Sequence, residues 1–238
     1  MRNLLTRLVA KAQRAARRLE AFDRQRRALL VVAALCSSET ALAQKRPGAR
    51  PTMPRGREIA LARSAAPSVV SENARVWIWT GVRYVIADSG KSSVNCYVGR
   101  PWDEGVEPHC FDEEGSRTIM PIMMRRVELY AAGKPELEVE RDIADGLTSG
   151  RFRLPSRAAI TYMMSGAQKL VNGEGTAVGA WQPHMMIYMP YLTAEASGLT
   201  AFTPGVGFVE NPGQALSALI ITVRQFVAPD SIATRQPD

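Results

Sequence analysis

The sequence is poor in the residues and motifs that most often identify an enzyme. Its 238 residues include two histidines, His109 and His184, and three cysteines. It has no Gly-x-Ser-x-Gly nucleophile elbow, no phosphate-binding loop, no Gly-x-Gly-x-x-Gly turn, no His-Glu-x-x-His pair and no Cys-x-x-Cys pair. It also has no repeat of fixed period. Because these signatures are missing, the sequence alone does not identify an activity.

A long apolar run that would cross a membrane is missing near the N-terminus as well. The run at residues 28–35 has eight residues, whereas a helix needs about 20 to cross the hydrocarbon core. It follows the basic pair Arg26-Arg27 and precedes the small-residue site at Ala43. This pattern predicts a secretory signal peptide over residues 1–43, and hence a periplasmic or secreted protein with no stable membrane span in the mature chain. The alternative is a lipoprotein anchored at Cys36.

The body of the chain lacks a strong excess of one charge. The formal net charge is +7, but nine basic and three acidic residues lie in residues 1–43. Four more basic residues lie in residues 44–56, which also hold three prolines and two glycines and are therefore predicted to form a flexible linker. From Arg57 onward there are 17 basic and 20 acidic residues, so no nucleic-acid-binding surface is expected.

Two cysteines, Cys96 and Cys110, remain outside the predicted signal peptide. In an oxidising compartment, two cysteines that do not form a Cys-x-x-Cys pair favour a disulfide over a metal site. Closing a loop of this size would stabilise the fold by about 3 kcal/mol. Two buried free thiols are the alternative.

The pattern of apolar residues predicts a single α+β domain over residues 57–227 and a disordered tail at 228–238. The segments with helical periodicity are residues 57–66, 122–132 and 136–149. The strand-like segments are residues 75–79, 83–87, 94–98, 184–189 and 218–227, and residues 158–164 fit a short helix or a buried strand. The first three strands are expected to form an antiparallel meander. The predicted architecture is a mostly antiparallel sheet of five or six strands with two to four helices packed on one face.

The stretch from Trp181 to Tyr191 has the highest density of chemically interesting side chains. It contains His184, Tyr188 and three methionines between two prolines, and is predicted to be a core strand with a polar group. A lone histidine in such a strand is often a structural residue. The eight methionines from Met120 to Met189 are expected to fill the core, although a cluster lining a cavity would suit an apolar ligand.

The leading hypothesis is non-enzymatic binding of a small molecule or a cell-envelope component in a pocket near His184 and Tyr162. Arg151, Arg153 and Arg157 are the other candidate ligand-binding residues, because guanidinium groups bind carboxylate or phosphate groups through two hydrogen bonds. Alternatively, these arginines pair with the acidic residues of the body.

An enzyme is the second hypothesis, namely a hydrolase-like enzyme that uses His184 with or without a metal ion. Tyr162, Tyr188 and Ser165 are its candidate catalytic partners. His109 and Asp112 are the weak metal-ligand candidates, in a segment that otherwise fits a solvated turn. No cofactor is expected.

Three segments carry a resemblance to known sequences. They are Glu58–Pro67, Gly150–Ser165 and Pro183–Pro190. In these segments the chain resembles a group of uncharacterised exported bacterial proteins with no assigned activity. The resemblance covers most of residues 57–227 and implies export and a single domain, but it implies no chemistry.

Overall fold

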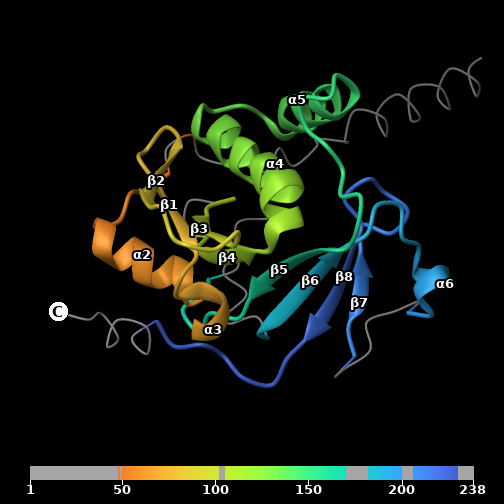
Figure 1. Cartoon of the computed structure of the whole chain (residues 1–238). Coiled ribbons are helices and arrows are strands. Elements are labelled where there is room, and N and C mark those ends of the chain that lie inside the picture. The colour runs from red at the N-terminus through yellow and green to blue at the C-terminus, as the bar shows by residue number, and fades with distance from the viewer. Residues whose placement is uncertain (1–47, 49, 102–104, 170–181, 200–205, 230–238) are drawn as a thin grey trace, which may run out of the picture. The chain divides into compact units, whose positions relative to one another are not determined.

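The computed structural model describes residues 48, 50–101, 105–169, 182–199 and 206–229 (Figure 1). The predicted signal peptide with Cys36, the beginning of the predicted linker and nearly all of the predicted tail lie outside these residues. The described residues belong to one compact unit, Gln44–Asp238. Among them, no helix has both the length and the apolar character needed to cross a membrane.

Eight strands form one open mixed sheet in the described part of the chain. They are β1 (Arg75–Trp79), β2 (Tyr84–Asp88), β3 (Asn95–Gly99), β4 (Glu107–Phe111), β5 (Ala159–Met163), β6 (His184–Tyr188), β7 (Phe208–Glu210) and β8 (Ala218–Thr222). Their order is β2-β1-β3-β4-β5-β6-β8-β7, and neighbouring strands are antiparallel except β1 and β3. The prediction of an α+β fold with a mostly antiparallel sheet is confirmed, whereas the predicted five or six strands and two to four helices were too few, since the described residues form eight strands and five helices.

The two strands that the sequence did not predict are β4 and β7. Strand β4 contains Pro108, which has no N–H group and is normally confined to edge strands or bulges. It is tolerated because β4 pairs with β3 along its whole length, whereas its pairing with β5 begins only at Cys110. Strand β7 has three residues, which is too short to show an alternating pattern.

The predicted antiparallel meander over β1 to β3 is wrong. Strand β1 lies between β2 and β3, and Arg75 pairs in parallel with Asn95. The chain reaches the far side of β1 because the turn after β2 crosses the start of β1, where the Asn73 carbonyl accepts hydrogen bonds from the two amides at residues 91 and 92. Gly90 permits this crossing: its φ is +60°, and a Cβ there would lie 2.5 Å from the backbone of residues 74 and 75.

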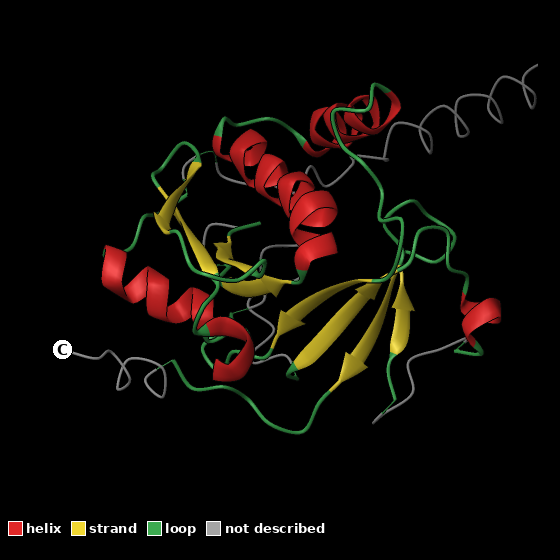
Figure 2. Cartoon of the chain, in the orientation of Figure 1, coloured by secondary structure: helices red, strands yellow, loops and turns green. Residues whose placement is uncertain are grey.

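Helices cover both faces of the sheet, so the prediction that they pack on one face is wrong. The helices are α2 (Arg55–Arg63), α3 (Ser68–Ser71), α4 (Glu113–Ala131), α5 (Glu136–Thr148) and α6 (Ala194–Ser197). Neighbouring residues of a strand point to opposite faces. On β3, Cys96 and Val98 pack in the same cluster as Leu61 of α2, whereas Tyr97 packs in the cluster of α4 with Ile119. Figure 2 shows the strands between these two helices.

Helix α4 begins nine residues before the predicted start at Ile122. The Asp112 side chain accepts a hydrogen bond of 2.7 Å from the Gly115 amide, which is an N-cap, and two glutamates occupy the first turn. Pro121 lies inside the helix rather than at its start. A proline inside a helix costs free energy because a backbone hydrogen bond is lost, and burial of the neighbouring apolar residues of α4, including Met120 and Ile122, offsets this cost.

At the end of the predicted flexible linker, Arg50 and Met53 pack on the domain, whereas residues 51, 52 and 54–56 are exposed. Arg50 is buried, its Nε donates to the Arg100 carbonyl at 2.9 Å, and its own carbonyl accepts from the Trp79 indole at 3.1 Å. Arg100 in turn forms a buried ion pair with Glu58, 2.8 Å between Nη2 and Oε1. The prolines and glycines of this segment predicted a flexible chain, whereas contacts of Arg50 and Arg100 hold its end on the domain.

The predicted disulfide between Cys96 and Cys110 is present. The two residues are directly opposite each other in the register of β3 and β4, with 4.1 Å between their Cα atoms. The bond joins two neighbouring strands on the face that α2 covers. It therefore closes the connection between β3 and β4 onto the sheet.

Candidate functional site

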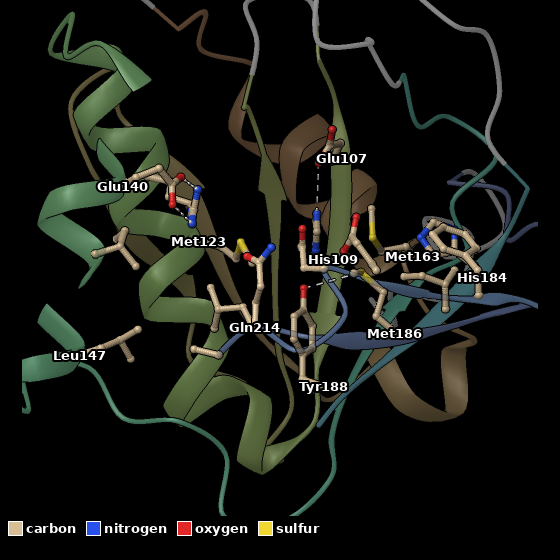
Figure 3. A pocket seen from close by; sticks show the side chains of 18 of the residues that line it. Glu107, His109, Met123, Glu140, Leu147, Met163, His184, Met186, Tyr188 and Gln214 are labelled. Atoms are coloured by element: carbon tan, nitrogen blue, oxygen red, sulfur yellow. Dashed lines mark hydrogen bonds and ion pairs between the residues drawn. The ribbon is translucent and has the colours of Figure 1, made fainter. Parts of the chain in front are cut away.

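A cleft of about 830 Å³ lies on the face of the sheet that α4 partly covers. Its walls are α4 and α5 on one side and strands β4 to β8 on the other (Figure 3). The lining residues are Glu107, His109, Met123, Arg126, Glu140, Ile143, Ala144, Leu147, Met163, His184, Met186, Tyr188, Phe208, Glu210, Asn211, Gln214, Ala215, Leu216 and Ile220. This volume is in the range of sites for small organic molecules.

Strand alternation selects which side chains reach the cleft. Every second residue of β6 lines it, namely His184, Met186 and Tyr188, and the same holds for Glu107 and His109 of β4. The register places Met163 of β5 directly opposite His184. Two histidines that are 75 positions apart in the sequence therefore line one cleft.

His184 is 3% exposed and held by a main-chain contact. Its Nδ1 atom lies 2.8 Å from the Gln182 carbonyl oxygen. A carbonyl oxygen can only accept, so Nδ1 carries the proton of the neutral ring and Nε2 carries the lone pair. Burial lowers the pKa of His184, which favours this neutral form at pH 7.

His109 belongs to a row of stacked rings on the same face. Its imidazole lies 5.3 Å from the Tyr97 ring and 5.7 Å from the Phe111 ring, centroid to centroid. Its Nε2 is 3.7 Å from Glu107 Oε2, whereas its Nδ1 is buried and has no hydrogen-bond partner among the described residues. The stacking fixes the ring plane, and an acceptor or donor nitrogen is left unused.

Glu210 of β7 contributes a second carboxylate to the cleft. Burial and the nearby charge of Glu107 raise its pKa. On the opposite wall, Arg126 of α4 and Glu140 of α5 form an ion pair through two contacts, one of them 3.0 Å between Nη2 and Oε2. This pair joins the two helices at the cleft.

The remaining lining is mostly apolar and rich in sulfur. Met123, Met163 and Met186 reach the cleft from α4, β5 and β6. The Tyr188 hydroxyl donates to Met186 Sδ at 3.7 Å, and burial raises the pKa of this hydroxyl well above its usual range. Methionines therefore line a cavity, which is the arrangement expected for an apolar ligand.

Several predicted site residues lie elsewhere. Tyr162 packs with the cluster on the α2 face, opposite to His184. Ser165 is fully buried, and its hydroxyl is 2.6 Å from the Ser64 hydroxyl. The structure therefore brings Tyr188, but neither Tyr162 nor Ser165, into the cleft with His184.

The three candidate arginines do not line the cleft either. Arg151 pairs with Asp142 at 3.0 Å, and its guanidinium stacks 4.9 Å from the Phe152 ring. Arg157 lies 3.4 Å from Glu113, and Arg153 is exposed. The alternative expectation, that these arginines pair with acidic residues of the body, describes Arg151 and Arg157 correctly.

The two candidate metal ligands, His109 and Asp112, have separate structural roles. Asp112 caps α4, whereas His109 lies in the row of rings described above. Among the described residues there is no group of three or more His, Cys, Asp or Glu side chains that could hold a metal ion.

Glu107, Glu210, Arg126 and Glu140 are the cleft residues that sequence reasoning missed. The sequence does contain a signal for Glu107, because Glu107, His109 and Phe111 alternate as in a strand, but Pro108 argues against a strand there.

Comparison of the chain with protein-family models, with curated proteins and with solved structures gave no match.

Proposed function

We propose that the chain is an exported binding protein that holds a small organic molecule in the cleft between α4, α5 and strands β4 to β8. The observation that carries this proposal is the cleft itself, which combines about 830 Å³ of space, an apolar wall and polar groups on the strands. The export part of the proposal rests on the signal-peptide pattern at residues 1–43 and agrees with the disulfide between Cys96 and Cys110.

Binding is favoured over hydrolysis by the chemistry of the groups beside His184. A hydrolase that forms a covalent intermediate needs a nucleophile within hydrogen-bond reach of a base. Ser165 lies with Ser64 outside the cleft, and Tyr188 is held protonated by burial. A neutral imidazole, a tyrosine hydroxyl and carboxylates still provide donors and acceptors for orienting a ligand.

The test is to close the cleft with a bulky side chain at a site where the fold tolerates it. Ala144 of α5 lines the cleft and is exposed, so Ala144→Trp adds bulk without entering the core. Ala196 of α6 is also an exposed helical alanine but does not line the cleft, so Ala196→Trp is the matched control. Ligands are found by native mass spectrometry of the exported protein and by thermal-shift screening of a chemically diverse library.

We expect ligands that bind the wild-type protein and Ala196→Trp with equal dissociation constants, and Ala144→Trp at least tenfold more weakly. Ligands that bind Ala144→Trp as tightly as the wild type would place the binding site elsewhere. A protein that carries no molecule and binds no member of the library would refute the binding function.

A further inference from the structure

The charges that line the cleft do not balance. Three carboxylates and one guanidinium belong to the described lining residues. The guanidinium of Arg126 is already paired with Glu140, which leaves Glu107 and Glu210 without a lysine or arginine in the lining. Within 4 Å of the Glu107 carboxylate, the basic group that the described residues provide is the His109 ring at 3.7 Å, which is longer than a hydrogen bond.

The charge of Glu107 disfavours the ionised form of Glu210. The charge of Glu107 adds to burial in raising the pKa of Glu210, which means that the ionised form of Glu210 is penalised in the folded protein. Burying a charge without a partner costs free energy, and such groups concentrate at functional sites. A positive charge placed between the two carboxylates would remove this penalty.

An independent observation on His109 indicates a ligand with a polar group. The ring is 7% exposed and lines the cleft, and Nδ1 has no partner among the described residues. Figure 3 shows the ring between Glu107 and Tyr188. A ring nitrogen of histidine is a donor when it carries a proton and an acceptor when it does not, so the unpartnered Nδ1 offers a hydrogen-bonding position to a polar group of a ligand.

The rest of the lining selects against a bare metal ion and for an organic body. Hard cations require six or more oxygen ligands or several waters, whereas Met123, Met186 and Leu216 present sulfur and carbon. Phe208 also lines the cleft, and aromatic rings can stabilise an organic cation.

We propose that the occupant of the cleft is an organic cation, an amine or guanidine carried on an apolar body, whose charged end lies at Glu210 and Glu107. This inference rests on the proposed binding function and specifies its ligand class. The apolar body packs on the methionines, and a polar group of the ligand pairs with Nδ1 of His109.

The test compares three probes of one shape: 4-phenylbutylamine, 4-phenylbutanol and 4-phenylbutyrate. Their dissociation constants are measured by titration calorimetry at pH 7 for the wild-type protein, for Glu210→Gln and for Glu107→Gln. Glu195→Gln is the matched control, because Glu195 is an exposed glutamate of α6 outside the cleft. Binding of the alcohol reports that each variant is folded.

The wild type is expected to bind the amine more tightly than the alcohol and the alcohol more tightly than the carboxylate. Glu210→Gln is expected to weaken amine binding about 10- to 100-fold, the effect of losing one hydrogen bond to a charged group, and to leave alcohol binding unchanged. Glu195→Gln is expected to change neither. Raising the salt concentration should weaken amine binding selectively.

Two results separate the failure of this inference from the failure of the binding function. If library ligands that Ala144→Trp blocks are neutral or anionic, and the amine binds no better than the alcohol, the organic-cation inference is wrong and the binding function stands. If neither the probes nor any library compound binds, both are wrong.

Discussion

The buried ion pair between Glu58 of α2 and Arg100 provides the sharpest test of how α2 is held against the sheet. The side chains are 0% and 1% exposed, and Oε1 and Nη2 are 2.8 Å apart. Glu58 Oε1 also accepts from the Trp79 amide at 2.9 Å, and Arg100 donates to the carbonyls of Pro51 and Val98. Removing one partner leaves a buried charge without its counter-charge.

We expect Arg100→Met to lower the free energy of unfolding by about 3–5 kcal/mol, the cost typical of breaking a buried pair. For a domain of this size that corresponds to a fall in Tm of about 6–20 °C. Glu58→Gln keeps the acceptor for the Trp79 amide but strands the guanidinium, so we expect a loss of similar size.

The double variant Glu58→Gln/Arg100→Met removes both charges and should cost much less than the sum of the single variants. The contact between Arg100 Nη2 and Glu58 Oε1 lacks hydrogen-bond geometry, and Glu58 Oε2 has no hydrogen-bond partner among the described residues. The pair therefore recovers its desolvation cost incompletely. We expect the double variant to lose about 1–2 kcal/mol, mainly from the unmet carbonyls. Urea unfolding, followed by tryptophan fluorescence to which the buried Trp79 contributes, measures the stability of all three variants. Additivity of the two single effects within 0.5 kcal/mol would refute the coupling.

Three further predictions concern other elements of the fold. Replacing Cys96 and Cys110 with alanine should lower the free energy of unfolding by about 3 kcal/mol, measured against the oxidised wild type in urea, and an equal stability would mean that the bond constrains nothing. Gly207→Ala should destabilise the protein by more than 2 kcal/mol and abolish ligand binding in the cleft, because φ is +133° and a Cβ would lie 1.8 Å from the Ile220 carbonyl oxygen; a variant with wild-type Tm would show that β7 adapts. A hydrogen bond from the Ser156 amide, and then Arg117, lower the pKa of Glu114 to about 2. The ionised Glu114 side chain therefore stabilises the folded state fully above pH 4.5, and this contribution is lost as the pH falls towards 2. Glu114→Gln should be less stable than the wild type at pH 7 and equally stable near pH 2, which thermal unfolding across this range will measure.

Sequence patterns over a few residues predicted correctly those elements that are determined by residues close together in the sequence. Helix α5 begins after Pro135 and ends at Thr148, one residue from the predicted end. Its start signal, its stop signal and its buried residues all lie within one short segment of the sequence. The same reasoning failed for α4, where Pro121 is a local stop signal that the packing of the helix overrides. The linker prediction likewise missed the contact of Arg50, because the partner of Arg50 is the Arg100 carbonyl, 50 positions away in the sequence.

Charge patterns were similarly informative only at short range. The segment from Arg151 to Arg157 was predicted to bind an anion, yet Asp142 and Glu113, both on the helices beside it, take up two of its guanidinium groups. The site instead collects carboxylates from two strands that the sequence did not reveal. Neither Glu107 nor Glu210 is distinguishable from a surface glutamate until its strand is known.

The composition of the cleft follows from the register of the strands. Met163 is opposite His184 in β5 and β6, and this pairing turns Tyr162 to the other face. A slip of one residue would reverse the two, because successive side chains of a strand point to opposite faces. The sequence placed His184 on a strand but carried no information on that register, so a pocket containing Tyr162 and one containing Met163 were equally compatible with it. Only the packing of buried residues on both faces of the sheet decides between them, and it selects the methionine.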